Sequence, residues 1–457
     1  MPGMRLSQIS GGGWPCVAAL AVALVAGGGG SPSPAPEIAV QIAVAALALL
    51  CWFGAQREND RIPRRALVVA ALMLVVPVLQ LVPLPPDLWQ ALPGRAAAVE
   101  ALGLIGRADT WRPVSLAPAR TLAALLATVP AALVVLMVAA CGNRARLRVL
   151  MTIAAGGIAT VIVGTAQLTQ GPSGFLRFYA AGSTTLDGFQ ANHNSTADVL
   201  LIAIVAAAAV CRCRLKGAAR QSLALGITGA IIAVFSLGVV LTASRTGIVL
   251  LPLSLAAAAT LLWPALAPFV HASRGLAMGL VAIGGIAVLG LLRLSVFDRI
   301  LARFEVLRDM RPELWQDSLF AAQSYFPFGV GMGNFVPALL ASERLEVVRE
   351  TMPNRAHNEL LELAVEAGLF GLAAWAAIAA LVVAGAFARR KDPPSNERAM
   401  AFAGAACLAI LALHSLVDYP FRSMSLAIAG AACAGLILPR REAGIRTVRS
   451  IEGNVKQ

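Results

Sequence analysis

Long runs of apolar residues, separated by short polar segments, follow one another along most of the 457-residue chain. A helix of about 20 apolar residues crosses the hydrocarbon core of a bilayer, which is ~30 Å thick. Runs of this length predict about twelve membrane-spanning helices and therefore an all-α polytopic membrane protein. They lie near residues 14–30, 37–55, 66–84, 121–140, 147–168, 195–211, 221–242, 246–263, 276–294, 359–388, 399–415 and 424–438.

This pattern divides the chain into four regions. Residues 1–294 carry the N-terminal transmembrane helices, and residues 295–358 form a long, polar and helical loop between the ninth and tenth spans. Residues 359–438 carry the C-terminal transmembrane helices, and residues 439–457 form a basic tail. The first run is short and ends in glycines, so it is typical either of a retained span or of a cleaved signal peptide.

The composition excludes an ordinary soluble protein. Hydrophobic residues make up 58% of the chain and charged residues 13%, which is more apolar surface than one soluble core can bury. The formal net charge of +13 would suit a nucleic-acid partner, but the basic residues lie in short clusters between apolar runs. We therefore expect the lipid bilayer as a partner, and no nucleic acid.

The seven cysteines lie in or beside apolar runs and predict no disulfide framework. Cys211 and Cys213 form the closest pair, with no further Cys or His near them in the sequence. Two neighbouring thiols alone do not make a metal site. We expect no metal and no cofactor.

The basic clusters indicate an orientation in the membrane. They occur in alternate connections between the spans, and Lys and Arg collect in cytoplasmic loops. The remaining connections then lie together on the outer face, where residues far apart in sequence can build one site. The cytoplasmic clusters are 57–65, 143–148, 211–220, 272–274, 388–392 and the tail after Pro439, and the outer loops are 85–120, 169–194, 243–245, 295–358 and 416–423.

A polar insert, residues 311–371, carries the candidate chemistry. It contains His357, one of only four histidines, directly before an apolar helical run. A neutral imidazole on the outer face can take a proton from a hydroxyl group, so His357 is our candidate general base. An ordinary histidine at a helix start is the alternative. Glu362 and Glu366 follow inside the apolar run, and we expect them to have structural partners, because carboxylates in a membrane need them.

The same insert contains a glycine-rich loop, residues 327–333, that ends in Asn334. Glycine lets the backbone approach a neighbour closely. We interpret this loop as part of an active-site lid, and Asn334 as a substrate-binding residue.

Three arginines are candidates for binding an anionic substrate. Arg245 lies in a short break between two apolar runs, where an arginine is costly unless it faces water, protein or an anion. Its planar guanidinium fits phosphoryl oxygens, although it can also extend to lipid headgroups. Arg311 lies four residues before Trp315, so the two can share a helical face and line a pocket floor. Arg355 lies two residues before His357.

Two further segments of the outer face are more simply read as structural. His193 lies in a turn that caps the next helix. Asp418 lies in a short hairpin next to His414, and its simplest partner is Arg422, four residues later.

Taken in order, several segments resemble the O-antigen ligase and polymerase superfamily of bacterial envelope proteins. They are LTASRTGIV at 241–249, RPELW at 311–315, PFGVGMGNF at 327–335, AHNELLELAVEAGLFG at 356–371 and HSLVDYPFRS at 414–423. QLVPLPPDLW and WRPVSLAPARTL, between residues 80 and 122, are also similar to members of this group. Where relatives often read NRNH, this chain reads NHNS at 192–195.

The resemblance implies a GT-C-like, metal-independent glycosyltransferase in the bacterial inner membrane, with its active site facing the periplasm. The implied donor is a polyprenyl-diphosphate-linked glycan, and the acceptor is a glycolipid or another glycan. His357 matches the family's proposed base, and Arg245 and Arg311 match the arginines that bind the diphosphate. Glu366, Trp315 and Asp418 are then expected to support the site.

Two alternatives stay open at this point. A ligase and a polymerase of this superfamily use the same donor and differ in the acceptor. A glycolipid transporter would also have about twelve spans, but transporters often show repeated halves and bind near the bilayer midplane. The candidate residues of this chain gather instead at one face.

Overall fold

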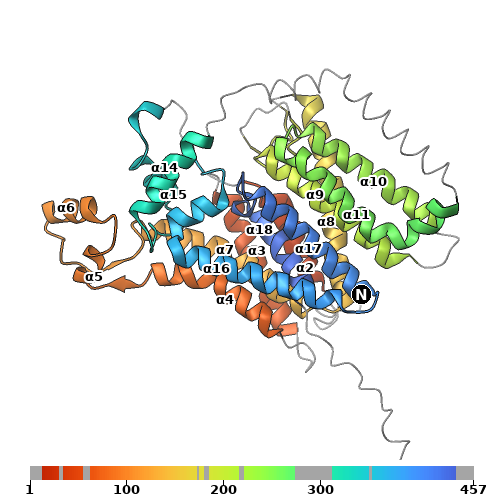
Figure 1. Ribbon diagram of the computed structural model, residues 1–457, viewed down its shortest axis with the longest axis horizontal. Helices are drawn as coiled ribbons and strands as arrows, with labels where there is room; N and C mark the ends of the chain where they lie inside the picture. The colour runs from red at the N-terminus through yellow and green to blue at the C-terminus, as the bar shows by residue number, and fades with distance from the viewer. Residues whose placement is uncertain are drawn as a thin grey trace, which may run out of the picture.

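A computed structural model describes residues 13–29, 34–54, 62–171, 174–179, 185–215, 221–272, 311–348 and 353–438 (Figure 1). Over these residues the protein is all-α, apart from the two-residue strands β1 (Pro83–Leu84) and β2 (Arg112–Pro113), which pair antiparallel. The predicted ninth span, the start of the loop that follows it and the basic tail lie outside the described residues.

Eight of the described helices are long and apolar enough to cross a membrane. They include α3 (Pro34–Gly54), α7 (Pro118–Ala140), α8 (Asn143–Gln170), α9 (His193–Arg214), α10 (Gln221–Leu241), α11 (Arg245–Ala272), α16 (Glu359–Arg390) and α17 (Asn396–His414). Each coincides with a run predicted from the sequence.

The other described helices are shorter. Among them, α2 (Trp14–Ala26) and α18 (Met424–Ile437) are apolar, and both coincide with predicted spans. The predicted run at 66–84 forms α4 (Arg64–Gln80), which has 17 residues. The remainder are α5 (Pro86–Gln90), α6 (Ala96–Leu104), α14 (Arg311–Ser324), α15 (Phe335–Leu340), and the 3₁₀ turns η2 (Leu345–Val347) and η3 (Pro420–Arg422).

Helix α9 lies at the centre of the main core. Its residues 195–209 are buried, and it packs against α8, α10, α11 and α17. All seven residues from Ala203 to Ala209 are alanine, isoleucine or valine, and small residues let neighbouring helices approach closely. Ser254 of α11 donates a hydrogen bond to the carbonyl oxygen of Leu201 over 2.7 Å, which ties the two helices at mid-length.

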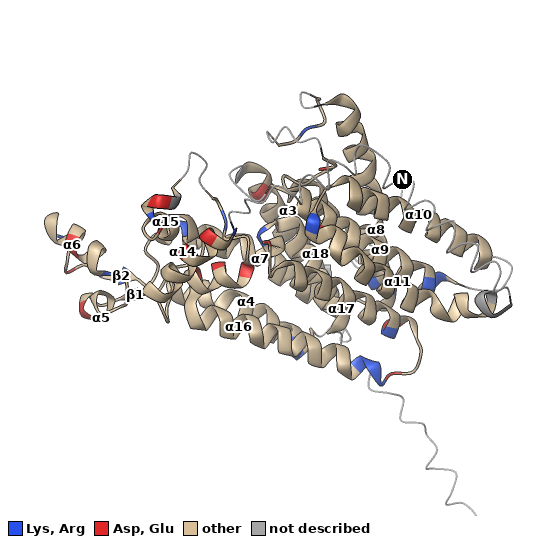
Figure 2. Cartoon of the chain, turned by 45° about the horizontal axis from the view of Figure 1, so that its top comes forward, with Lys and Arg blue, Asp and Glu red and all other residues tan. Residues whose placement is uncertain are grey.

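The predicted outer loops meet at one end of this bundle. Thr121 donates to the carbonyl oxygen of Met332 at 2.8 Å, and the backbone of Leu186 donates to that of Leu241 at 3.1 Å. In Figure 1, α14 and α15 lie on the same side of the molecule as α5 and α6. At the other end, the side chain of Asn143 bonds Glu397 across 254 residues of sequence. Basic residues, drawn in blue, lie there at the end of α16 (Figure 2).

The glycine-rich loop packs against a break in α16. Gly368 has a φ of 56° inside the helix, and the amide of Leu369 donates outward to the carbonyl oxygen of Pro327 at 2.9 Å. The amide of Gly331 donates back to the carbonyl oxygen of Glu366 at 2.9 Å. A Cβ on Gly329 would overlap that same carbonyl, so the close approach these glycines permit is to α16. The loop is thus packed tightly against α16, whereas we expected it to be part of an active-site lid.

Gln80, at the end of α4, contacts both the glycine-rich loop and α16. Its side-chain nitrogen donates to the carbonyl oxygen of Glu366 at 2.9 Å, and its oxygen accepts the amide of Met332 at 2.9 Å. A buried amide that is satisfied at both atoms fixes the two segments relative to one another. Gln80 therefore fixes the glycine-rich loop to α16, the helix that begins two positions after His357.

Candidate active site

His357 lies in a left-handed turn immediately before α16. Its φ is 49°, and the next residue, Asn358, caps the helix by accepting the amide of Leu361 at 3.0 Å. The other end of the Asn358 side chain donates to the carbonyl oxygen of Leu416 at 3.0 Å. This cap ties the turn before α16 to the loop after α17, and so brings His357 to Asp418.

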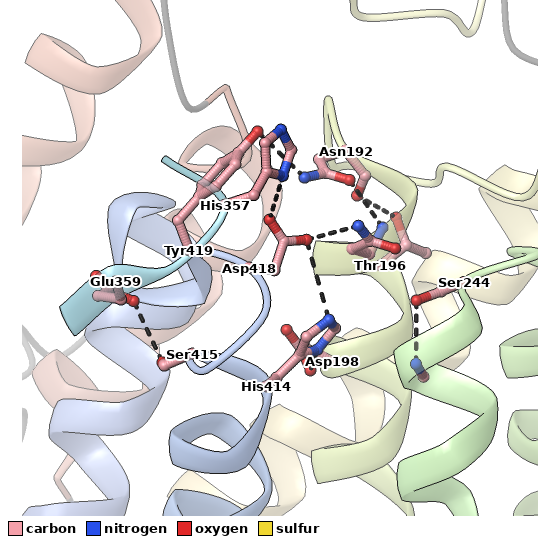
Figure 3. A network of polar contacts seen from close by, with 12 residues as sticks. Asn192, Thr196, Asp198, Ser244, His357, Glu359, His414, Ser415, Asp418 and Tyr419 are labelled. Atoms are coloured by element: carbon pink, nitrogen blue, oxygen red, sulfur yellow. Dashed lines mark hydrogen bonds and ion pairs between the residues drawn. The ribbon is translucent and has the colours of Figure 1, made fainter. Parts of the chain in front are cut away.

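His357 and Asp418 form a hydrogen-bonded pair. Nδ1 of His357 lies 3.1 Å from Oδ1 of Asp418 (Figure 3). Asp418 is almost fully buried, whereas the His357 side chain is 31% exposed. When Nδ1 carries the proton and donates it to the carboxylate, Nε2 keeps its lone pair and can accept a proton. The pair is thus arranged as a base with a carboxylate that orients it.

Several groups hold Asp418 in its charged form. Burial alone would raise its pKa, but the hydrogen bond from His357 and the charges of His414 and His357 outweigh burial and lower it. Asn194, at the start of α9, adds a hydrogen bond of 2.5 Å from its amide nitrogen to Oδ2. Asp418 is therefore a carboxylate throughout the neutral range.

A second histidine–carboxylate pair lies directly beneath. Nδ1 of His414 is 2.6 Å from Oδ1 of Asp198, and both side chains are buried. The other ring nitrogen of His414 has no hydrogen-bond partner and lies 3.9 Å from Oδ2 of Asp418. Imidazoles and carboxylates thus alternate from the half-exposed His357 down into the helix bundle (Figure 3).

Tyr419 forms one wall of the site. The centre of its ring lies 5.1 Å from that of His357, and its hydroxyl accepts a hydrogen bond of 3.4 Å from the amide of Asn192. Burial and the charge of Asp418 raise the pKa of Tyr419 to about 12. The phenol is therefore neutral near pH 7 and limits how the His357 ring can turn.

The backbone before His357 is held from two sides. Nε1 of Trp315, on α14, donates to the carbonyl oxygen of Ala356 at 2.9 Å. Glu362 accepts the amide of Ala356 at 3.1 Å and a guanidinium nitrogen of Arg355 at 2.8 Å. Trp315 and Arg355 thus help to position the backbone next to His357, and their part in the site stays a prediction.

Arg422 is surrounded by three buried glutamates of α16. It lies 2.7 Å from Glu366 and 3.5 Å from each of Glu359 and Glu362. Glu362 and Glu366 are paired, as we expected for carboxylates in an apolar helix. The expected pair of Asp418 with Arg422 was wrong, because the η3 turn directs Arg422 toward α16 while Asp418 faces His357.

Two other predicted binding residues, Arg245 and Arg311, each begin a helix. Arg245 and Arg311 are the first residues of α11 and α14, and both are half-buried. Arg311 begins α14, the helix whose Trp315 bonds the backbone of Ala356, next to His357. Ser244, the residue before Arg245, lies near the start of α9 in the same view (Figure 3).

Asn334 faces the protein interior. It is 1% exposed, and its amide nitrogen bonds Ser115 at 3.1 Å and the carbonyl oxygen of Val330 at 3.2 Å. This placement favours a part in holding the glycine loop. Its contact with substrate stays a prediction.

Sequence reasoning missed the second layer of the site. Asp198 and His414 are single polar residues inside apolar runs, and such residues carry a cost unless they meet a partner. That signal was present in the sequence, although nothing in it pairs two residues 216 positions apart. Asn194 and Tyr419 gave no signal of their own.

No group of three or more His, Cys, Asp or Glu that could hold a metal ion occurs within the described ranges. The structure therefore singles out no metal ligands there.

Part of the chain is similar to a known protein family. Residues 229–376 match a family model described as O-antigen ligase, and this segment includes Arg245, Arg311 and His357. Asp418 lies beyond it. No curated protein matches the chain significantly.

Proposed function

Because residues 229–376 match a family model described as O-antigen ligase, in a chain whose described residues include eight candidate membrane spans, we propose that the protein is a membrane glycosyltransferase. It transfers a polyprenyl-diphosphate-linked glycan to an acceptor sugar on a glycolipid or another glycan. The reaction takes place at the periplasmic face of the bacterial inner membrane. The observation that carries the proposal is the hydrogen-bonded His357–Asp418 pair, in which the His357 side chain is partly exposed and the Asp418 carboxylate is buried.

His357 acts as the general base. Nε2 takes the proton of an acceptor hydroxyl as the hydroxyl oxygen attacks the anomeric carbon of the donor. The bond from that carbon to the diphosphate oxygen breaks, and its electron pair leaves with polyprenyl diphosphate. General base catalysis of this kind contributes about 10²–10⁴-fold, because a sugar hydroxyl has a pKa far above 7.

Asp418 keeps the imidazole ready for this step. Its negative charge favours the imidazolium that forms when His357 takes the proton, and its position fixes which nitrogen faces the acceptor. The His414–Asp198 pair supports Asp418 from below. Because all three are buried, their arrangement does not have to reorganise during the reaction.

Arginines stabilise the leaving group. Charge grows on the diphosphate as the glycosidic bond breaks, and preorganised guanidinium groups favour that state over the ground state. Arg245 and Arg311 take this role, and Arg355 contributes its nitrogens not used by Glu362. In this proposal the arginines supply the positive charge, so transfer continues in the presence of a chelator.

The membrane arrangement is part of the proposal. We infer about twelve spans, with the regions 1–294, 295–358, 359–438 and 439–457 as the sequence divides them. The basic clusters lie in the cytoplasm, and the loop 295–358 lies in the periplasm. The meeting of the other loops at one end of the bundle supports this orientation.

Reconstitution tests the function. Purified protein is mixed with a polyprenyl-diphosphate oligosaccharide and candidate acceptors, in chelator and without nucleotide. A ligase moves the glycan to a foreign acceptor such as lipid A-core and releases polyprenyl diphosphate. A polymerase lengthens the glycan on its own lipid carrier.

A transporter gives a different result. It moves the intact donor across a sealed vesicle and breaks no glycosidic or phosphate bond. Transport without transfer to any acceptor would refute the enzyme.

A further inference from the structure

A cavity of about 630 Å³ opens at the end of the bundle opposite His357. It lies between the last turn of α9, the later part of α11, the end of α16 and the start of α17. Helix α16 has 32 residues and runs from one end to the other. Helix α16 is broken at Gly368, but the 22 residues from Leu369 to Arg390 alone rise roughly 33 Å at about 1.5 Å per residue, so the cavity is a separate site from the candidate active site.

Four arginines line this cavity: Arg212, Arg389, Arg390 and Arg398. Arg389 pairs with Asp392 at 3.2 Å and with Glu397 at 3.4 Å. A guanidinium nitrogen of Arg398 donates to the backbone carbonyl of Asp392 at 3.0 Å. Within the described part of the chain, Arg212 and Arg390 have no carboxylate partner, so the cavity carries net positive charge.

The rest of the lining is mostly apolar. It includes Leu261 and Pro264 of α11, Phe387 of α16, and Phe402 and Ala405 of α17. Phe387 is 61% exposed and Phe402 is 39% exposed, although both lie on apolar helices that are candidate spans. Their exposed faces suit contact with hydrocarbon chains.

We propose that this cavity binds an anionic phospholipid of the cytoplasmic leaflet. The phosphate diester pairs with Arg212, Arg390 and Arg398, and the acyl chains lie along Phe387 and Phe402. Basic pockets between transmembrane helices on the cytoplasmic side suit anionic headgroups. The planar guanidinium of arginine adds directed hydrogen bonds to phosphate oxygens.

The combination of charge and apolar surface selects this occupant. Free phosphate meets the arginines but leaves the phenylalanine faces uncovered. A zwitterionic lipid covers those faces but brings a cation next to the arginines. Arginines that serve only to orient a protein in the membrane lie in loops and do not have to line a cavity. These arginines come from three helices and line the same cavity.

The test is lipid binding to the purified full-length protein in detergent. Native mass spectrometry and thermal unfolding are measured with phosphatidylglycerol, cardiolipin, phosphatidylcholine and inorganic phosphate. We expect the two anionic lipids to remain bound and to raise the unfolding temperature, and the other two to do neither. In the variant Arg212→Gln/Arg390→Gln/Arg398→Gln, affinity for the anionic lipids should fall about tenfold or more, because charge-assisted contacts are lost.

A matched variant separates a site from general charge. Arg64→Gln/Arg65→Gln/Arg144→Gln removes the same charge from two other basic clusters, and its lipid binding should equal that of the wild type. The proposal would be overturned if both triple variants lost the same affinity for anionic lipids. It would also be overturned if phosphatidylcholine remained bound as well as the anionic lipids, or if inorganic phosphate raised the unfolding temperature as much as they do.

Two further measurements complete the test. Phe402→Ala should weaken lipid binding without changing the charge, and unchanged binding would contradict the proposed path of the acyl chains. Glycan transfer is assayed separately in every variant. Lipid binding without transfer would refute only the proposed enzyme, and transfer without selective lipid binding would refute only this site.

Discussion

Nδ1 of His357 and Oδ1 of Asp418 are 3.1 Å apart, although the two residues are separated by 61 positions and by two long helices. The chain runs the length of α16 and back along α17 before Asp418 reaches His357. The pair therefore depends on how these two helices are joined and packed. It also fixes the tautomer of the imidazole, which is the property that a general base needs.

Removal of either member of the pair should impair transfer. His357→Ala removes the base, so the turnover number should fall by about 10²–10⁴-fold. Asp418→Asn keeps the shape but removes the charge that favours the imidazolium, so the turnover number should fall while KM changes little. Kinetics with the reconstituted donor and acceptor measure both effects.

The control is Asp109→Asn, an exposed carboxylate in the loop between α6 and β2 at the same end of the molecule. It should transfer as the wild type does. Full activity of His357→Ala at matched membrane levels would remove that residue from the mechanism.

Acid should destabilise the folded protein by protonating Asp418. Its pKa lies below the ordinary 3.8 because bonds to His357 and Asn194 and the charges of the two histidines outweigh burial. Because the folded-state pKa is lower than the unfolded-state pKa, the carboxylate stabilises the folded protein at pH values above the unfolded-state pKa. That contribution is lost as the pH falls below about 3.8 through the folded-state pKa.

The comparison is between the wild type and Asp418→Asn in thermal unfolding from pH 6 to pH 3. The wild type should be more stable at pH 6, and the difference should shrink below about pH 4. A difference that stays constant over this range would show that the carboxylate charge is not what stabilises the fold.

The apolar pattern predicted the long helices because each needs only local information. A run of about 20 apolar residues has few alternatives to a membrane span. The run at 66–84 was placed correctly, but α4 ends at Gln80, where the side chain turns to the glycine loop. The sequence has no local sign of that contact, since the partners of the Gln80 side chain lie 248 to 286 positions away.

The site was predicted in part for the same reason. His357 and Arg355 lie two positions apart in the polar insert, so their proximity could be inferred, whereas Trp315 lies 42 positions before His357 and its contact with Ala356 could not. Asp418 was expected to support the site, but its contact with His357 could not be inferred, because Arg422 at four residues' distance looked like a sufficient partner. The structure gives Arg422 three other carboxylates, and three opposite charges within 3.5 Å outweigh one neighbour.

Arg422 should be essential to folding. Arg422→Met leaves Glu359 and Glu366 buried without a cation and Glu362 with Arg355 alone, and breaking a buried ion pair in this way costs about 3–5 kcal/mol. We expect a large fall in the unfolding temperature in detergent, or loss of the protein from the membrane. Arg107→Met, at an exposed arginine of the α6–β2 loop, is the control and should unfold like the wild type. Similar unfolding of the two variants would refute the charge cluster as a stabilising feature.

The break in α16 should not tolerate a side chain. Gly368 has a φ of 56°, and a Cβ there would overlap the carbonyl oxygen of Pro327. Gly368→Ala should cost at least about 1–3 kcal/mol from backbone strain, and more from displacement of the glycine loop. Gly103→Ala is the matched control, since that glycine lies in α6 with open space around its Cβ position. If both variants unfold at the same temperature, the loop is not braced against α16 as described.

The two ends of the bundle should face opposite sides of the membrane. Leu345, in the polar insert, is 87% exposed, and Lys391 lies at the exposed turn after α16. Single cysteines at these positions, in a background with the seven native cysteines replaced, are treated with an impermeant thiol reagent in sealed inside-out and right-side-out vesicles. Leu345→Cys should react only in right-side-out vesicles, and Lys391→Cys only in inside-out vesicles, because basic clusters such as Arg389–Lys391 remain in the cytoplasm. Reaction of both cysteines from the same side would contradict the orientation, and with it both the periplasmic placement of His357 and the assignment of the arginine-lined cavity to the cytoplasmic leaflet.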